Sequence, residues 1–230
     1  VVVTDSFKKY IIKEHQIKPE KIGVFKNGVL ISNFKKPKPN DVMTLKESLG
    51  LEDKIVISYI GTHGLAHGLK FILESISKIS NPDLHFLFIG DGAEKDNLIK
   101  EAKYLKLENI IFLPSVQKQE IINYLSIIDV ALVNLKKSDT FKSVIPSKIF
   151  EAAALQKPIL LGVEGEAKEI VESYGAGVCY DPGSKSGFIK ACVEISKSDT
   201  YNKVKSNTKN LAKNFNRKKI ANQLLNTILK

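Results

Sequence analysis

Short apolar runs rich in β-branched residues recur along the chain from residue 54 onward. Each run is nearly continuous, which is typical of parallel strands that are covered on both faces. The runs lie at 54–61, 84–90, 109–114, 129–135, 157–163 and 176–180.

Between these runs lie segments in which apolar residues recur at intervals of three and four. Ile72, Ile76 and Ile79, for example, share one face of a helix. Strands that alternate with helices predict an α/β fold, a Rossmann-like doubly wound parallel sheet. The right-handed crossover rule places helices on both faces of that sheet. The helical segments span 68–79, 94–105, 118–128, 147–155 and 166–174.

The N-terminal part of the chain does not follow this alternation. Residues 1–34 begin with VVVT, a short strand, and continue with an amphipathic helix, DSFKKYIIKEHQI. A second strand, PEKIGVFKNGV, runs into the Asn27-Gly28 turn. Residues 35–42 are rich in Lys and Pro and predict a linker, so the sheet domain is expected to span 43–214. Because the chain begins inside a strand, we expect it to be part of a longer protein.

The C-terminal stretch is helical, with a break expected near residues 214–216. Beyond the break, Ile220, Leu224, Leu225 and Ile228 form an apolar stripe. A single helix of this length is marginal in water. Residues 215–230 are therefore expected to dock on another surface, which need not belong to the sheet domain.

Composition narrows the classes of protein. The chain has 230 residues, 43% apolar and 26% charged, which suffices for a core without disulfides. No apolar run approaches the roughly 18 residues that cross a bilayer. Cys179 and Cys192 are too far apart for a Cys-x-x-Cys site, and no histidine pair has metal spacing. Reduced cysteines and a cytoplasmic protein are expected.

The formal net charge of +10 raises the question of an anionic partner. Arg217 is the single arginine among 35 basic residues, and the lysines are scattered. Nucleic-acid recognition favours the planar guanidinium fork, so we expect no nucleic-acid partner. Solvated surface is the simplest interpretation. Weak attraction to an anionic small molecule, or peripheral contact with the inner face of the membrane, is the alternative.

Three glycines, Gly61, Gly64 and Gly68, follow the first strand of the predicted sheet. In such sheets, ligands bind beyond the carboxyl ends of the strands. Backbone N–H groups in a glycine-rich turn can approach an anion closely, and the helix behind adds partial positive charge. The loop therefore predicts an anion site, with a tight strand-to-helix turn as the alternative.

Two further loops follow strands at the same edge. Backbone groups at Pro114, Ser115 and Val116 could pair with the edge of a base, unless they form an ordinary turn. Gly165 and Glu166 are expected to open a helix whose N-terminus faces the cleft, with Glu166 near the ligand. A solvated acidic face is the alternative for Glu166.

The loop after the fourth strand leads into a helix that starts at Ser147 and Lys148. Ser147 is the expected N-cap. Lys148 in the first turn opposes the helix dipole, a conflict that makes sense if it meets bound phosphate. Glu151 lies at i+3 on the same face and could accept hydrogen bonds from two sugar hydroxyls. A surface Lys–Glu pair is the alternative.

The motifs also occur in a recognisable order: VTDSFKKYII, PEKIGVFKNGVLISNF, YIGTHGLAHGL, LHFLFIGDG, NIIFLPSV, YLSIIDVALVNL, IPSKIFEAAALQKPIL and EGEAKEIVESYGAGVCYDPG. This order resembles the C-terminal half of a GT-B glycosyltransferase of family four and covers essentially the whole chain. The chain looks most like the bacterial subgroup that transfers N-acetylated amino sugars, including N-acetylfucosamine, in surface polysaccharide synthesis, lipopolysaccharide among them.

In that family, two Rossmann-like domains face each other across a cleft, and the C-terminal one holds the nucleotide-sugar. The resemblance implies roles by position. Gly61 and Gly64 would line the diphosphate, and Ser147 and Lys148 would hold it. Glu151 would bind the ribose, and the loop of Pro114, Ser115 and Val116 would contact the base. Gly165 and Glu166 would lie near the donor sugar or its phosphates.

The chain also departs from the family pattern. Glu151 matches the second Glu of the Glu-x7-Glu motif, but the first falls at Ser143. The family's paired Arg and Lys of the first loop fall at Thr62 and His67. Lys148 is therefore the main candidate for neutralising the leaving diphosphate. His67, if it titrates near neutrality, could help; a plain surface histidine is the alternative.

The implied reaction is transfer of a glycosyl group to an acceptor hydroxyl, with retention of anomeric configuration and without metal or cofactor. The donor is expected to be a UDP-sugar, with GDP as the next choice, and the acceptor a saccharide or lipid-linked saccharide. Residues 1–34 match a remnant of the N-terminal acceptor domain plus the crossover, and residues 215–230 would return to that domain. With the N-terminal domain missing, we expect donor binding but little transfer by this chain alone.

Two rival functions remain open from the sequence. A non-hydrolysing sugar-nucleotide epimerase shares the two-domain architecture, but it needs catalytic carboxylates that cannot be assigned here. A non-catalytic donor-binding module that docks on a separate acceptor domain would keep the Lys148 and Glu151 pair.

Overall fold

The computed structural model describes residues 1–117 and 119–229. Lys118, the first residue of the expected helix 118–128, and Lys230, the last residue of the expected C-terminal helix, lie outside the described residues.

Six parallel strands form one sheet in the order β3-β2-β1-β4-β5-β6, which confirms the predicted doubly wound sheet. In the central pairs, Ile57 of β1 lies opposite Phe86 of β2 and Val130 of β4. The order of strands reverses between β1 and β4, so their carboxyl ends flank the point at which such sheets bind ligands. The strands are β1 (Ile55–Ile60), β2 (Leu84–Ile89), β3 (Ile110–Leu113), β4 (Val130–Asn134), β5 (Ile159–Gly162) and β6 (Gly177–Cys179).

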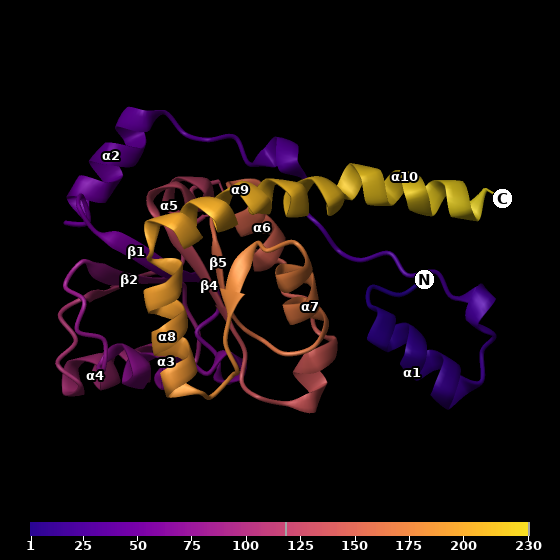
Figure 1. The fold of residues 1–230 in the computed structure, drawn as a ribbon, viewed down its shortest axis with the longest axis horizontal. Helices are drawn as coiled ribbons and strands as arrows, with labels where there is room; N and C mark the ends of the chain where they lie inside the picture. Colours follow the sequence, from indigo (N-terminus) through magenta and orange to yellow (C-terminus); the bar gives the residue numbers. More distant parts are fainter. Residues whose placement is uncertain (118, 230) are drawn as a thin grey trace.

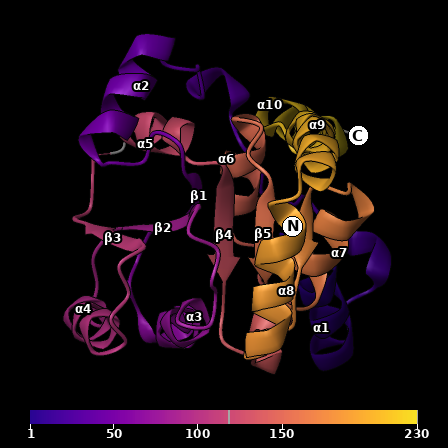
Figure 2. The same ribbon diagram turned by 60° about the vertical axis from the view of Figure 1, so that its left-hand side comes forward.

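Helices cover both faces of the sheet (Figure 2). Successive strand residues point to opposite faces, so Val56 joins one apolar cluster and Ile57 the other, and neither is exposed. One layer contains α3 (Leu69–Ile76), α4 (Lys95–Tyr104) and α8 (Lys185–Ile195). The other contains α2 (Pro39–Ser48), α5 (Ile121–Ile127), α6 (Lys148–Ala154), α7 (Glu166–Ser173) and α9 (Ser198–Asn214).

Two of these helices are absent from the expectations above, and one of them changes the predicted linker. Helix α2 begins at Pro39, so residues 39–42 are its first turn and not part of a linker. Proline suits this position because the first N–H groups of a helix have no partner within it. Helix α8 follows β6, with Ser184 as its N-cap.

Residues 1–34 lie beside the sheet domain and contribute no strand to its sheet. The two expected strands reduce to one isolated parallel bridge between Val2 and Val24, because a lone two-stranded pair has little to stabilise it. Helix α1 (Asp5–His15) lies between them, capped by the Thr4 hydroxyl. Short 3₁₀ turns complete the chain at Pro19–Lys21, Ile31–Asn33, Leu65–His67 and Asp139–Ser143.

The expected break in the C-terminal helix is confirmed between α9 and α10 (Arg217–Ile228). At the break, Phe215 stacks on Phe150 with ring centroids 4.7 Å apart, and Asn216 bridges to Val29. Helix α10 projects beyond the sheet domain, toward the side on which α1 lies (Figure 1). Its apolar stripe is largely uncovered, since Leu225 is 53% and Ile228 67% exposed.

Candidate functional site

A cavity of about 190 Å³ lies beside the switch point, between β1, β4, α5 and α6. Four of the residues singled out from the sequence line it: Gly61, Ser147, Lys148 and Glu151. The remainder of its wall is mainly apolar, from Ile60, Ile121, Leu125, Ile128, Ala131, Leu132, Val133 and Ala152, with Ser58. An apolar wall with a few convergent polar groups is typical of a site for a small organic ligand.

Lys148 brings a positive charge into this cavity without a counter-ion. Its Nζ lies 3.2 Å from the Tyr59 hydroxyl and 4.3 Å from the centre of the Tyr59 ring. Among the residues that the structure describes, no carboxylate lies within ion-pair distance of this ammonium. Burial lowers the pKa of Lys148 to about 8, although the charge of Glu151 works in the opposite direction. The group is still mostly charged at pH 7 and can receive an anion.

Gly61 lines the cavity, but its backbone N–H does not have the role expected for it, which was to approach an anion. Its N–H donates to the Ile89 carbonyl at 2.8 Å and is not available to an anion. A Cβ on Gly61 would lie 2.5 Å from the Nζ of Lys148, and its φ of +142° disfavours other residues. The absence of a side chain therefore makes room for the Lys148 ammonium at the sheet edge.

Ser147 occupies the N-cap position of α6 as expected, but its side chain does not make the capping hydrogen bond. Its backbone is already helical, at φ −58° and ψ −27°, and its side chain makes no capping hydrogen bond. The carbonyl of Pro146 accepts from the N–H of Ile149 instead, so the turn begins one residue earlier. The exposed Ser147 hydroxyl remains beside Lys148 at the cavity.

Glu151 lies one turn after Lys148, and both line the cavity. Among the described residues the two side chains form no ion pair within 4.0 Å, which argues against the alternative of a simple surface pair. The Glu151 carboxylate is half-buried and remains able to accept hydrogen bonds from a ligand.

The glycine loop, residues 61–68, extends from this cavity to a second one of about 370 Å³ that Gly64 and Gly68 line. In the first half of the loop, the N–H of His63 donates to the Asp91 carbonyl. The N–H groups of Thr62 and Gly64 have no backbone acceptor among the described residues. Burial and the charge of Lys148 lower the pKa of His67. This shift favours the neutral form of the His67 ring, and its expected help in neutralising the diphosphate stays a prediction.

Sequence reasoning missed the residues that hold the glycine loop in place. The Tyr59 hydroxyl donates to the Thr62 carbonyl at 2.7 Å, and the Asn134 side chain donates to the His67 carbonyl at 2.7 Å. Asn134 is buried at the end of β4, in an otherwise apolar strand. A polar residue at a buried strand end was the signal that could have revealed it.

Pro114, Ser115 and Val116 lie at the end of β3, the edge strand that is separated from β1 by β2. None of the three lines the cavity that contains Lys148. The carbonyl of Leu113 just before them accepts from Lys95 at 3.0 Å, which fixes the start of this loop. Their contact with a base remains a prediction.

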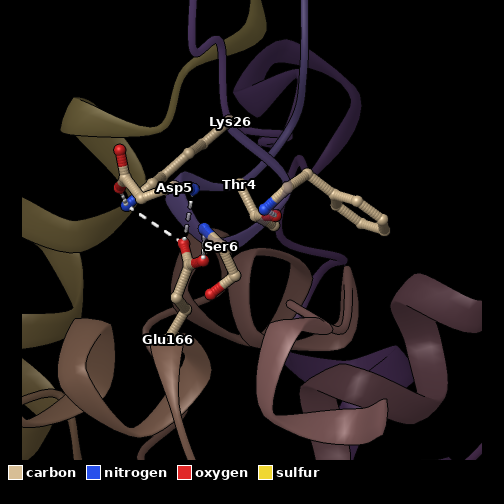
Figure 3. A network of polar contacts seen from close by, with 6 residues as sticks. Thr4, Asp5, Ser6, Lys26 and Glu166 are labelled. Atoms are coloured by element: carbon tan, nitrogen blue, oxygen red, sulfur yellow. Dashed lines mark hydrogen bonds and ion pairs between the residues drawn. The ribbon is translucent and has the colours of Figure 1, made fainter. Parts of the chain in front are cut away.

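Glu166 faces the N-terminal segment and not the cavity (Figure 3). Its carboxylate accepts from the N–H groups of Asp5 at 3.1 Å and Ser6 at 2.6 Å, at the start of α1. Lys26 lies 3.5 Å away. Burial works to raise the pKa of Glu166, but the hydrogen bonds from Ser6 and Asp5 and the charge of Lys26 together hold it below its ordinary value.

This arrangement differs from the expected place of Glu166 near the ligand, because the start of α1 supplies N–H donors that the sequence could not locate. Gly165 before it has φ +71°, and a Cβ there would overlap the Lys142 backbone. Gly165 is thus needed for the close approach of the loop after β4. A donor contact by either residue stays a prediction.

Within the described residues, no group of three or more His, Cys, Asp or Glu side chains gathers in a way that could hold a metal ion. Over the same part of the chain, no helix combines the length and the apolar character that crossing a bilayer demands. That the transfer needs no metal ion stays a prediction.

Comparison with known proteins shows what the chain is similar to. The family model described as Glycosyl transferases group 1 matches residues 41–214. The putative colanic acid biosynthesis glycosyl transferase WcaI of Escherichia coli is 28% identical over 180 residues, which is 76% of this chain and 44% of that protein. The probable glycosyltransferase WbjE of Pseudomonas aeruginosa is 32% identical over 152 residues, 64% of this chain and 37% of WbjE.

Solved structures agree on the fold. Anabaena HepE in complex with UDP and glucose superposes with a TM-score of 0.84 at 21% identity, over 99% of this chain and 62% of HepE. WaaG, a glycosyltransferase involved in lipopolysaccharide biosynthesis, gives 0.76 at 14% identity, over 92% of this chain and 57% of WaaG. Of the curated sequence relatives, by contrast, the chain spans less than half the length.

Proposed function

The chain belongs to the group 1 family of glycosyl transferases, and from that premise we propose that it binds the nucleotide-sugar donor of a glycosyl transfer at the cavity of Lys148. One observation carries the proposal. Lys148 places an ammonium group without a carboxylate partner, among the described residues, beside an apolar cavity that Ser147 and Glu151 also line. A partly buried ammonium group that lacks a carboxylate partner is suited to binding a phosphate or diphosphate.

The arrangement divides the donor into parts. The diphosphate would meet the Lys148 ammonium, the Ser147 hydroxyl and the free amides of the glycine loop. The ribose would meet the Glu151 carboxylate, which can accept from two hydroxyls. The base would enter the apolar part of the cavity toward Ile121 and Leu125.

In the reaction, the bond between the anomeric carbon and the diphosphate oxygen breaks, and an acceptor hydroxyl forms a new bond to that carbon while its proton passes to a base, for which the oxygens of the leaving diphosphate suffice. Negative charge grows on the leaving diphosphate as the bond lengthens. Lys148 and the loop amides face the place where that charge develops. Preorganised donors of this kind contribute about 3 kcal/mol each in other enzymes, and this stabilisation requires no metal.

The choice of donor and acceptor is part of the proposal. UDP is the preferred nucleotide, and the solved neighbour HepE is described in complexes with UDP and with UDP-glucose. An N-acetylated amino sugar follows only from the resemblance to the amino-sugar subgroup, and retention of configuration only from the resemblance to the family. WcaI is described as a putative colanic acid biosynthesis glycosyl transferase, and a further relative, TuaH of Bacillus subtilis, as a putative teichuronic acid biosynthesis glycosyltransferase. These descriptions support a saccharide or lipid-linked saccharide acceptor in surface polysaccharide synthesis.

The acceptor domain is also part of the proposal. The relatives are longer than this chain, and in a GT-B enzyme the acceptor is bound by the other domain. We therefore expect residues outside this chain to supply the acceptor site and most of the catalytic turnover. Peripheral contact with a membrane fits a lipid-linked acceptor and the scattered lysines.

Calorimetric titration of the chain with UDP, GDP, ADP and CMP tests the proposal. We expect UDP to bind most tightly and GDP next. A transfer assay with UDP-N-acetylglucosamine and a saccharide acceptor should give little product from this chain alone. Failure to bind any of the four nucleotides would overturn the proposal, and robust turnover by the chain alone would overturn the need for a second domain.

A further inference from the structure

Asn134 and Tyr180 form a buried polar pair beneath the glycine loop. Asn134 is the last residue of β4 and 2% exposed, and Tyr180 directly follows β6 and is 4% exposed. The Asn134 Nδ2 donates to the His67 carbonyl at 2.7 Å, and the Tyr180 hydroxyl donates to the Asn134 Oδ1 at 2.7 Å. A backbone carbonyl can only accept, so the amide nitrogen must face His67, which leaves Oδ1 for Tyr180.

This pair supplies one of the two side-chain attachments of the glycine loop. At the first end, the Tyr59 hydroxyl donates to the Thr62 carbonyl. At the second end, Asn134 holds His67, and the N–H of Lys136 donates to the Ala66 carbonyl at 2.8 Å. Gly64, whose N–H has no acceptor in the part of the chain that the structure describes, lies between the two attachments.

The chain also makes room for the pair. A Cβ on Gly162, at the end of β5, would overlap the Asn134 side chain and the Tyr180 ring. The Tyr180 ring packs against Phe188 with centroids 5.3 Å apart, which fixes the hydroxyl from the other side. The ends of β4, β5 and β6 are therefore arranged around two linked side-chain hydrogen bonds, from Tyr180 to Asn134 and from Asn134 to the loop after β1.

We infer that Asn134, supported by Tyr180, is a positioning residue of the donor site. It fixes the His67 carbonyl and thereby sets the path of residues 64–68 relative to Lys148. The inference rests on the proposed function, because it assumes that the loop meets the diphosphate. A loop whose amides are held before the ligand arrives loses little freedom on binding, and this raises affinity.

Three variants of the full 230-residue chain test the inference with UDP as the probe. Asn134→Asp replaces the donor by an oxygen that repels the His67 carbonyl, and Tyr180→Phe leaves Asn134 in place but without its support. Asn109→Asp is the matched control, because Asn109 Nδ2 donates to the Leu84 carbonyl at 3.0 Å at the opposite edge of the sheet. Asn134→Asp and Asn109→Asp thus lose the same kind of hydrogen bond, from a side-chain amide to a backbone carbonyl, and only the former of these two bonds holds the loop.

We expect Asn134→Asp to weaken UDP binding about tenfold, Tyr180→Phe about threefold, and Asn109→Asp not at all, as the loss of one hydrogen bond predicts. Amide hydrogen exchange over residues 62–68, measured without nucleotide, should speed up in the first two variants and not in the third. Tyr180→Phe keeps the test decisive if Asn134→Asp does not fold.

The outcomes separate the two claims. Equal UDP affinity and equal loop exchange in all three variants would overturn the positioning role and leave the donor site intact. Absence of UDP binding by the unaltered chain would instead overturn the proposed function.

Discussion

Lys148 and Glu166 are the first residues of two neighbouring helices, α6 and α7, at the same edge of one sheet, and the structure treats them in opposite ways. The carboxylate of Glu166 is satisfied by two backbone N–H groups and by Lys26. The ammonium of Lys148 has a hydroxyl and an aromatic face beside it and, among the described residues, no carboxylate.

The difference shows in the direction of each pKa. Lowering the pKa of Glu166 means that the folded state favours its charged form, so this group stabilises the fold above its ordinary pKa and ceases to do so as the pH falls. Lowering the pKa of Lys148 means that the fold disfavours its charged form. The charge of Lys148 therefore costs stability at pH 7, and that cost is recovered only when an anion binds.

The largest effect is expected from Lys148→Met, which should separate binding from stability. UDP affinity should fall by about 1.5–3 kcal/mol, because a charge-assisted contact is lost. The free energy of unfolding at pH 7 should rise by about 1–3 kcal/mol, because unfolding no longer returns a charged lysine side chain from the cavity to water. Calorimetry and urea unfolding measure the two changes.

Lys157→Met is the matched control for that experiment. Burial also lowers the pKa of Lys157 to about 8, but this ammonium donates to the carbonyls of Ser126 and Ile128 and lies at the opposite end of β5. UDP affinity should not change in this variant. If Lys148→Met binds UDP as tightly as the unaltered chain, Lys148 does not belong to the site and the comparison fails.

The fold was largely predictable because its strands are buried on both faces and so appear as continuous apolar runs. The expected strands differ from the observed ones by one or two residues at their ends, as for 54–61 and Ile55–Ile60. Helix α8 was not anticipated, although its buried residues Phe188, Ala191, Cys192 and Ile195 recur at helical spacing and could have indicated it.

The site was predictable only where local sequence decides it. Gly61, Lys148 and Glu151 come together because strand ends and first helical turns converge at the switch point. The partners of Glu166 lie about 160 residues away, and no local pattern indicates them. The same holds for Asn134 and Tyr180, whose hydrogen bond joins two strand ends that are not neighbours in the sheet.

The next largest effect is expected from Glu166→Gln, which should show the reverse of Lys148→Met. Stability at pH 7 should fall by about 1–2 kcal/mol, because one of two partly buried N–H groups loses its acceptor and Lys26 loses an anion. UDP affinity should remain unchanged, as calorimetry can show. Glu169→Gln on the exposed side of the same helix controls for the loss of one negative charge.

A loss of UDP affinity in Glu166→Gln, but not in Glu169→Gln, would mean that Glu166 reaches the ligand as the sequence suggested. That result would require its contacts with α1 to be exchanged for contacts with the donor.

The pH dependence of binding gives a smaller effect that depends on Lys148 alone. Above the Lys148 pKa of about 8, the ammonium loses its proton and UDP affinity should fall about tenfold per pH unit. The phosphates of UDP are fully ionised over this range. Lys148→Arg should flatten the profile between pH 7 and 9, since guanidinium stays charged, whereas an equally steep profile in that variant would assign the loss to another group.

His63 offers the smallest expected effect on UDP binding and the sharpest challenge to the comparison, because it is buried and has no polar partner among the described residues, yet is not expected to bind UDP. It is fully buried, and neither ring nitrogen has a partner among the described residues. Unlike Lys148 it lines neither cavity of the glycine loop, and its neighbours are the rings of Tyr59, Phe88 and Phe112. An unsatisfied group should mark a ligand site only if it is charged and faces a cavity.

Burial, aided by the charge of Lys95, lowers the pKa of His63 to about 4, so the folded state holds it neutral. The unfolded chain binds a proton below pH 6.5 and the folded chain does not, so stability is lost as the pH falls from 6.5 toward 4. His63→Leu should remove about 2 kcal/mol of the loss between pH 7 and pH 5, measured by urea unfolding, and leave UDP affinity at pH 7.5 unchanged. Weaker UDP binding by this variant would show that a neutral buried group can also belong to the UDP site. The difference between Lys148 and Glu166 would then be explained only by their positions relative to the cavity, and not by their charges.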